Sequence, residues 1–565
     1  MLAAALLSMP VGAAAAQDTA SIPCIGQRIR SVVVRASAPT AAYLRRVPIL
    51  AKIAAATHVT THQQLIERFL LLHAGDHCEE LRRLESERIL RAQPFLADAS
   101  VYAIPAGPGQ VDLVVETTDE IAVVLEGTLS GGAPFARYIR FGNSNVSGEG
   151  MYLAGEWRSG GAFRDGYGAR FVDNQLLGRP YTLAVGGRVL PLGSEWEIQA
   201  THPFYTDIQR VAWLMRGGAR DDYVQFANDA NSNHGIRLAR NYFDIGGIVR
   251  IGPPGRLSLF GASLSGDDER PANTPVLITD HGFAPDTGPP LTQQFFAHRI
   301  ARVNLLWGVR DIGFRRVRGF DALTATQDFP VGFQYGTEFG RSLSVLGSRD
   351  DDIFMSGDLY AGAVGRTNGL RAQLVGEGRR DNSNGDWDGL LAAGQVTEYI
   401  KIWPRHTTLA SIEFSGGWRQ RVPFRLTLSD PIGGVRGYAG SDTPGGQRVV
   451  GRLEHRTFVA RPHGLGDLGV AGFVESGQLW AGDVPYGANT PPRTAVGVSL
   501  LAAVPPASSR MWRVDLAFPL NPGQRGRHLE LRLSNVDRTA FVLQEPSDIR
   551  GAREPSVPVS VFHWP

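Results

Sequence analysis

A chain of 565 residues is too long for one ordinary hydrophobic core, so two or more structural units are expected. Its formal net charge of +2 at pH 7 predicts neither a basic nucleic-acid surface nor an acidic tail, and no nucleic-acid partner is expected. A mean hydropathy of −0.12 is too polar for a bundle of membrane helices, whereas 67 glycines suit a turn-rich β protein.

The chain begins with a segment that is typical of exported proteins. Residues 1–16 are apolar and end in small residues, as in a secretory signal with an Ala-x-Ala cleavage site. A buried N-terminal helix is the alternative interpretation. No later stretch approaches the ~18 consecutive apolar residues of a membrane-spanning helix. We therefore expect an exported chain in which strands make any membrane crossing.

Residues 24–119 predict a small α/β unit. The expected elements, in order, are a strand over 28–35, helices over 61–75 and 76–93, and strands over 99–104 and 111–116. This β-α-α-β-β order resembles a POTRA domain, although the first crossover, residues 36–60, is longer than in that pattern. The resemblance implies a periplasmic module that offers a sheet edge to extended client segments. A plug or spacer is the alternative.

Both cysteines of the chain, Cys24 and Cys78, fall in this unit. In an oxidising compartment we expect them to form a disulfide, with two buried thiols as the alternative. Two thiols without a spaced histidine pair predict no metal site.

Residues 120–541 predict an array of strands. Apolar and polar residues alternate, as in 512–518, where Trp, Val, Leu and Phe share one face and Arg, Asp and Ala the other. No helices remain to cover so many apolar faces, so the pattern favours an antiparallel β-barrel embedded in lipid. At ~25 residues for each strand and its connection, we expect about 16 strands. A C-terminal extension, residues 542–565, follows, and its place is not predicted.

A glycine-bracketed turn near the end of this array presents one arginine, in the order Gly433-Gly434-Val435-Arg436-Gly437-Tyr438. Because an arginine side chain keeps its charge, it pairs best with a carboxylate through two hydrogen bonds. The candidate partner is Glu475, within Phe473-Val474-Glu475-Ser476-Gly477. An exposed loop arginine and an unrelated glutamate are the alternative.

Several motifs of the array resemble those of the BamA/TamA superfamily of outer-membrane barrels. The quoted segments are 141–153, 173–179, 202–207, the turn around Arg436, Leu453-Glu454-His455-Arg456 and 473–477. In that superfamily the Val-Arg-Gly turn folds into the barrel lumen, and five strands follow it. Five strand-like runs follow Arg436 here, at about 447–459, 468–480, 493–504, 510–519 and 528–537. By this criterion a second copy, Val317-Arg318-Gly319-Phe320, is not the superfamily turn.

The resemblance implies that Arg436 pairs with Glu475 in the lumen, beside an inward pair, Glu454 and Arg456. This chain departs from the superfamily pattern in having Glu475 where an aspartate is usual. The resemblance also implies a weakly paired seam between the first and last barrel strands, with 121–129 or 135–141 on one side and 529–536 on the other.

The function implied is assistance in inserting or translocating other proteins at the bacterial outer membrane. The expected partners are outer-membrane lipids, unfolded outer-membrane or secreted clients and periplasmic chaperones or accessory proteins. No catalytic motif occurs, so neither an enzyme nor a cofactor is expected. Residues 349–352 are acidic enough for calcium, but a solvated hairpin turn is favoured. The alternatives are a two-partner secretion pore for one exoprotein and a passive porin-like barrel.

Overall fold

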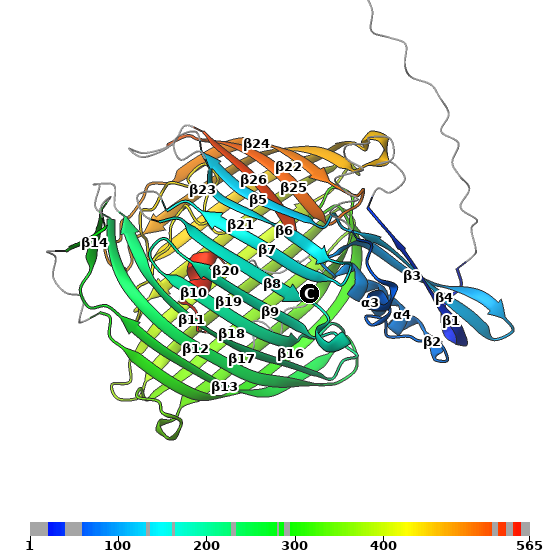
Figure 1. Ribbon diagram of the computed structural model, residues 1–565, viewed down its shortest axis with the longest axis horizontal. Coiled ribbons are helices and arrows are strands. Elements are labelled where there is room, and N and C mark those ends of the chain that lie inside the picture. Colours follow the sequence, from blue (N-terminus) through cyan, green and yellow to red (C-terminus); the bar gives the residue numbers. More distant parts are fainter. Residues whose placement is uncertain are drawn as a thin grey trace, which may run out of the picture.

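The computed structural model describes residues 21–39, 59–130, 136–160, 164–227, 233–279, 282–286, 294–521, 529–537 and 546–554. A small N-terminal unit lies against one end of a large barrel (Figure 1). The expected signal segment, residues 1–16, lies outside the described residues. None of the helices in the described part of the chain has the length and hydropathy to cross a membrane.

The N-terminal unit is a four-stranded sheet with two helices on it. Its elements are β1 (Ile25–Ser37), α3 (Gln63–Glu67), β2 (His77–Glu79), α4 (Glu80–Arg91), β3 (Leu96–Gly107) and β4 (Gln110–Asp119). The sheet order is β2-β1-β4-β3, with β1 parallel to β4 and the other pairs antiparallel. The core lies between sheet and helices and includes Leu65, Phe69, Leu90 and Phe95.

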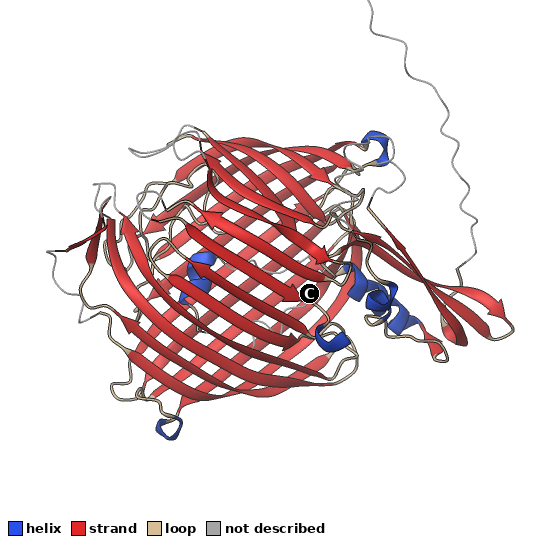
Figure 2. Ribbon diagram, in the orientation of Figure 1, coloured by secondary structure: helices blue, strands red, loops and turns tan. Residues whose placement is uncertain are grey.

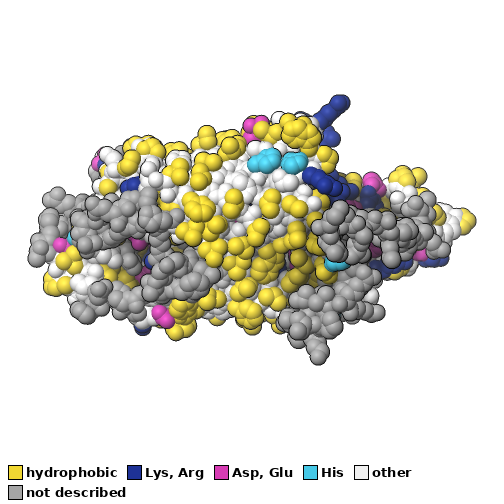
Figure 3. All heavy atoms as spheres, turned by 90° about the horizontal axis from the view of Figure 1, so that it is seen from above, with side chains coloured by type: hydrophobic (Ala, Val, Ile, Leu, Met, Phe, Trp, Pro, Cys, Tyr) yellow, Lys and Arg dark blue, Asp and Glu magenta, His cyan; other side chains and the backbone are white. Residues whose placement is uncertain are grey.

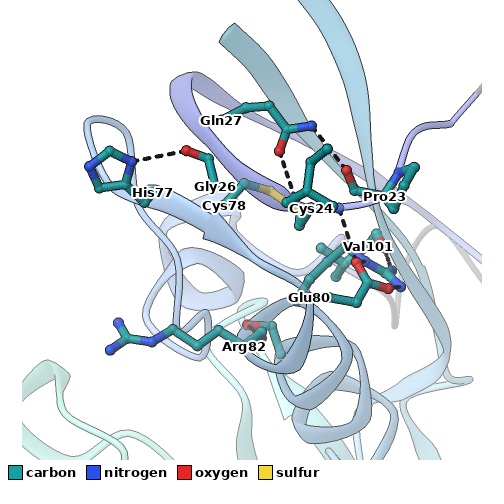
Figure 4. Close-up of a disulfide and its surroundings, with 12 residues drawn as sticks. Pro23, Cys24, Gly26, Gln27, His77, Cys78, Glu80, Arg82 and Val101 are labelled. Atoms are coloured by element: carbon teal, nitrogen blue, oxygen red, sulfur yellow. Dashed lines mark hydrogen bonds and ion pairs between the residues drawn. A yellow bond between two sulfur atoms is a disulfide. The ribbon is translucent and has the colours of Figure 1, made fainter. Parts of the chain in front are cut away.

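The second helix begins later than the sequence predicts. A helix was expected from Asp76, but residues 77–79 form β2 beside β1, and α4 begins at Glu80. A disulfide between Cys24 and Cys78 joins the start of β1 to β2, and Figure 4 shows it beside the hydrogen bond between His77 and the Gly26 carbonyl. This covalent link holds the segment in an extended pairing that helical periodicity does not reveal.

The remaining strands close into an antiparallel barrel, which surrounds the short C-terminal helix α5 (Ser547–Ala552) in Figures 1 and 2. Its strands are β5 (Val123–Ser130), β6 (Ala136–Val146), β7 (Met151–Arg158), β8 (Gly166–Asp173), β9 (Thr182–Val189), β10 (Ser194–His202), β11 (Val211–Ala227), β12 (Asn233–Ile251), β13 (Leu257–Pro271), β16 (His298–Arg318), β17 (Thr326–Ser342), β18 (Asp352–Val364), β19 (Asn368–Asp381), β20 (Trp387–Ile400), β21 (His406–Trp418), β22 (Gln447–Ala460), β23 (Asp467–Trp480), β24 (Arg493–Ala503), β25 (Arg510–Pro519) and β26 (Glu530–Asp537). A hairpin of β14 (Val276–Thr279) and β15 (Gly282–Pro285) extends from the β13–β16 connection.

The expected count of about 16 strands is wrong, because the described residues form a barrel of 20. The error comes from the length assumed for each strand and its connection. Several connections are tight turns, such as residues 252–256 and 365–367, so the chain uses only about 21 residues for each strand. The five strands that follow Arg436 are β22 to β26, in agreement with the five strand-like runs in the sequence.

The barrel wall is apolar outside and polar inside, the reverse of the arrangement in a water-soluble protein. Along β16, Val303, Leu305 and Trp307 face outward and are exposed, whereas Arg302 and Asn304 face inward and are buried. Figure 3 shows apolar side chains covering the middle of the barrel wall, with charged side chains nearer the two ends. The expected alternation, apolar outside and charged inside, is therefore that of the structure.

Candidate functional site: a charge cluster in the barrel lumen

The connection between β21 and β22, residues 419–446, folds into the barrel and carries the predicted arginine turn. Its apolar side chains Leu426, Leu428, Val435 and Tyr438 pack in one buried cluster against the inner wall. The Tyr438 hydroxyl donates to the carbonyl oxygen of Thr494 at 3.0 Å. The loop is thus held in the lumen by burial of apolar surface as well as by hydrogen bonds.

Two glycines allow the turn to approach the wall so closely. Gly437 has φ +92°, a left-handed conformation that side-chain-bearing residues rarely adopt. On β23, a Cβ at Gly477 would lie 2.6 Å from Cγ2 of Val435, so a larger residue would displace the turn. Gly433 and Gly434 donate their backbone N–H groups to Oδ1 and to the carbonyl oxygen of Asp430, both at 2.9 Å.

Arg436 lies at the centre of a cluster of buried charges. Its Nε lies 2.8 Å from Oε1 of Glu475, and its backbone N–H donates to Oε2 of the same carboxylate, also at 2.8 Å. Its Nη2 lies 3.0 Å from Glu454 and its Nη1 3.3 Å from Asp515. The guanidinium also lies 3.5 Å from the ring centroid of Phe473, as in a cation–π contact.

Neighbouring arginines complete the cluster. Arg513 donates to both oxygens of Glu454, at 2.8 and 3.1 Å, and Arg456 donates to Oε1 of Glu454 at 2.5 Å. Burial alone would lower the pKa of Arg436, but the carboxylates of Glu475 and Glu454 raise it above its ordinary value. Removing one member would leave an unpaired buried charge, so the cluster can act as an electrostatic latch between loop and wall.

Sequence reasoning missed several members of this site. Asp515 and Arg513 stand on the predicted inward face of 512–518, but alternation does not give depth within the lumen. Glu530 of β26 accepts hydrogen bonds from the backbone N–H groups of Gly437 and Ala439, at 2.9 and 3.1 Å. The turn around Arg436 therefore contacts the last strand of the barrel, a contact that no local motif signals.

The second Val-Arg-Gly copy forms a different feature. Arg318 ends β16 and is exposed, while the turn that follows, residues 319–325, is largely buried. Arg456 donates to the carbonyl oxygen of Asp321 at 3.1 Å, and Leu323 packs in a cluster with Ala471 on β23. This turn thus reaches across the barrel from β16–β17 to the wall near Arg436.

The other quoted motifs meet at the N-terminal unit. Asn145 donates to Oγ1 of Thr61 at 2.9 Å, and Gln175 donates to the carbonyl oxygen of Leu65 at 2.8 Å. Tyr205 belongs to the hydrophobic core of the N-terminal unit. Segments 141–153, 173–179 and 202–207 therefore dock the unit onto one mouth of the barrel.

The closure between β26 and β5 is the shortest ladder in the barrel wall among the described residues. Residues 530–533 of β26 pair with 127–130 of β5. Residues 534–537 and 123–126, which the structure also describes, lie in the two strands but do not continue that ladder. Two segments are predicted for the β5 side of the seam. Of these, 121–129 overlaps β5, the first barrel strand, and 135–141 overlaps β6, the second.

Side chains bridge the unpaired part of this closure. Arg510, at the start of β25, donates to the carbonyl oxygens of Ile121 and Pro94 at 3.0 and 2.8 Å. The hydroxyl of Ser508 donates to a carboxylate oxygen of Glu120. The last barrel strands are thus tied to the segment that leaves the N-terminal unit.

The described residues contain no group of three or more His, Cys, Asp or Glu side chains that could hold a metal ion. Within 349–352, Asp351 pairs with Arg341, and Asp352 accepts two hydrogen bonds from Arg302, at 3.1 and 2.9 Å. These carboxylates are thus used in ion pairs.

No known family model and no curated protein matches the chain. Three similar solved structures are BamA from Haemophilus ducreyi lacking POTRA domains 1–3, CdiB from Acinetobacter baumannii and CdiB from Escherichia coli. They are 11%, 11% and 12% identical, with TM-scores of 0.37, 0.38 and 0.37. Each match covers 90% of this chain, and 85%, 74% and 76% of the three neighbours.

Proposed function

We propose that this chain is an outer-membrane β-barrel that assists the insertion or translocation of other proteins. The observation that carries the proposal is the closure of a large barrel by a ladder that, among the described residues, has four pairs, 530–533 with 127–130. A short ladder can open sideways and expose a strand edge, to which an extended client segment adds. Client pairing and burial supply the free energy, so no cofactor or nucleotide is needed.

The reversed polarity of the wall supports a membrane location. An exposed apolar surface of this extent is costly in water and favourable in the hydrocarbon of a bilayer. A closed barrel also pairs the backbone groups of its strands without water, except where β5 and β26 part at the closure. We therefore place the barrel in the outer membrane and the N-terminal unit in the periplasm.

In this proposal the cluster around Arg436 is the latch that stiffens the wall next to the closure. The turn contacts β22, β23, β25 and β26 through Glu454, Glu475, Asp515 and Glu530. These strands lie on one side of the closure, so the latch holds them as a unit while β5 separates from β26.

The N-terminal unit acts as a POTRA domain that receives clients. Among the described residues, the outer edge of the twelve-residue strand β3 pairs with no other strand apart from a bridge between Ile22 and Ala103, while two arginines of α4 donate to its carbonyl oxygens at Ala99 and Val101. An incoming strand would replace these side-chain hydrogen bonds with a backbone ladder.

Depletion of the chain in its own host tests the proposal. For an insertion role, we expect several integral outer-membrane proteins to fall together, as measured by quantitative proteomics of the outer membrane and the medium. Loss of one exoprotein from the medium, with an unchanged outer membrane, would indicate a dedicated secretion pore. If both fractions stay unchanged while uptake of small solutes falls, the barrel is a passive porin and the proposal is wrong.

A further inference from the structure

The described part of the C-terminal extension, residues 546–554, lies inside the barrel. We propose that this segment is a removable plug: docked, it closes the lumen, and released, it opens a conducting path. It includes helix α5 and lines a lumen cavity of about 1820 Å³ together with the inserted loop and the inner wall. In Figure 1, α5 lies within the ring of strands.

One end of the plug is fixed to the inner wall by charge. Glu554 pairs with Arg302 on β16 and with Arg379 on β19, whose Nε lies 2.6 Å from Oε1 of Glu554. The carboxylate of Glu377 accepts from Nε of Arg553 at 3.0 Å and from the backbone N–H of Glu554 at 3.1 Å. The pocket is therefore complementary to an arginine followed by a glutamate.

The other end of the plug is fixed to the inserted loop. The Ser547 hydroxyl and the backbone N–H of Asp548 donate to Oδ2 of Asp430, at 2.7 and 3.1 Å. In return, Asp548 accepts the backbone N–H of Thr427 at 3.1 Å. The segment thus joins the inserted loop to the inner wall at β16 and β19, inside the lumen that a translocating chain or ion would use.

The chemistry of these contacts suits release better than permanent packing. Ile549 is the largest apolar side chain of the segment, whereas the loop buries Leu426, Leu428, Val435 and Tyr438. Contacts made mainly by charge lose their stability when one partner is removed or exchanged. A competing charged segment could therefore displace the plug without disrupting a hydrophobic core.

The carboxylates at the two ends lie in different surroundings. Burial alone would raise the pKa of Glu554, but Arg302 and Arg379 lower it below its ordinary value. Burial, and then the neighbouring carboxylate of Asp430, raise the pKa of Asp548 to about 6. Because Glu554 forms ion pairs with two arginines of the wall, it is the contact to substitute first.

Single-channel recording of the full chain in planar bilayers tests the plug. We expect Glu554→Gln to increase the open probability at least about tenfold, which corresponds to ~1.4 kcal/mol of docking free energy. The matched control is Asp321→Asn, which removes a cavity-lining carboxylate bonded to the Tyr399 hydroxyl at 2.8 Å and makes no hydrogen bond or ion pair with the described residues of the plug. The control should conduct like the wild type.

A reversible lock gives a second measurement. The side chains of Ser547 and Asp430 are in contact, so the double variant S547C/D430C should form a disulfide on oxidation. We expect the oxidised form to be closed and the reduced form to open. Wild-type protein with reductant controls for loss of the native disulfide between Cys24 and Cys78.

The plug proposal is wrong if wild type and Glu554→Gln have equal open probability and the oxidised and reduced forms of the double variant do not differ. The recordings need the barrel in a bilayer but no client. Failure here would therefore leave the proposed role in client assembly standing, and failure of that role would leave the plug testable.

Discussion

The two sides of the barrel wall are held together by different means. On the side formed by β11, β12, β16 and β17, strands pair over seventeen residues, as in 211–227 with 233–249. At the closure, β26 and β5 pair over four residues among those that the structure describes. At ~1 kcal/mol for each ladder hydrogen bond, this described ladder is several-fold weaker than the long ladders.

A cluster of buried side-chain charges also lies beside the short ladder. The arginine turn contacts β22, β23, β25 and β26, and Arg510 ties β25 to the segment before β5. Backbone hydrogen bonds inside a bilayer have no alternative partner, whereas ion pairs in a lumen can exchange. The strong side thus serves as a scaffold, and the closure is held by contacts that can be broken one at a time.

The largest expected effect comes from the arginine turn. Arg436→Ala leaves Glu475 and Glu454 buried with one cation fewer, and we expect a loss of about 3–5 kcal/mol in unfolding free energy. Urea titration of the barrel in lipid vesicles measures this loss. Hydrogen exchange should locate the weakening in β22 to β26 and leave β16–β17 protected.

The second Val-Arg-Gly copy provides the matched control. Arg318 is exposed, so Arg318→Ala should change stability by less than about 0.5 kcal/mol. If both alanine variants are equally destabilised, or both neutral, the charge cluster does not hold this side of the wall.

A smaller effect is expected for Arg510, which ties β25 to the segment that precedes β5. Arg510→Ala removes the hydrogen bonds to Ile121 and Pro94, a loss of about 1–3 kcal/mol that should be confined to local opening. Backbone amides of 123–130 and 530–537 should then exchange with solvent about tenfold faster or more, while those of β16–β17 keep their wild-type rates. Arg493→Ala, whose half-buried side chain donates to the Asn521 carbonyl at 2.8 Å and does not contact 120–130, should leave both sets unchanged.

The sequence predicts the barrel because alternation is local. It predicts Glu475 as a partner of Arg436, and Glu454 only as an inward-facing residue, because both stand in recognisable short motifs. It does not predict the strand number, since the length of each turn is set by how adjacent strands meet at the barrel mouth. The contacts of Glu530 and Glu554 join residues 93 and 252 positions apart, to Gly437 and Arg302 respectively. Such contacts depend on how the barrel closes and carry no local pattern.

In the proposed function, the wall opens between β5 and β26. Gly127 and Leu533 are paired in register across this closure, so G127C/L533C should form a disulfide that locks it, while W307C/T337C locks β16 to β17 as the control. We expect the barrel locked at the closure to stay folded but to lose client insertion in reconstituted vesicles, to recover it with reductant, and the control lock to have no effect. Client insertion at the wild-type rate by the barrel locked between β5 and β26 would contradict the account.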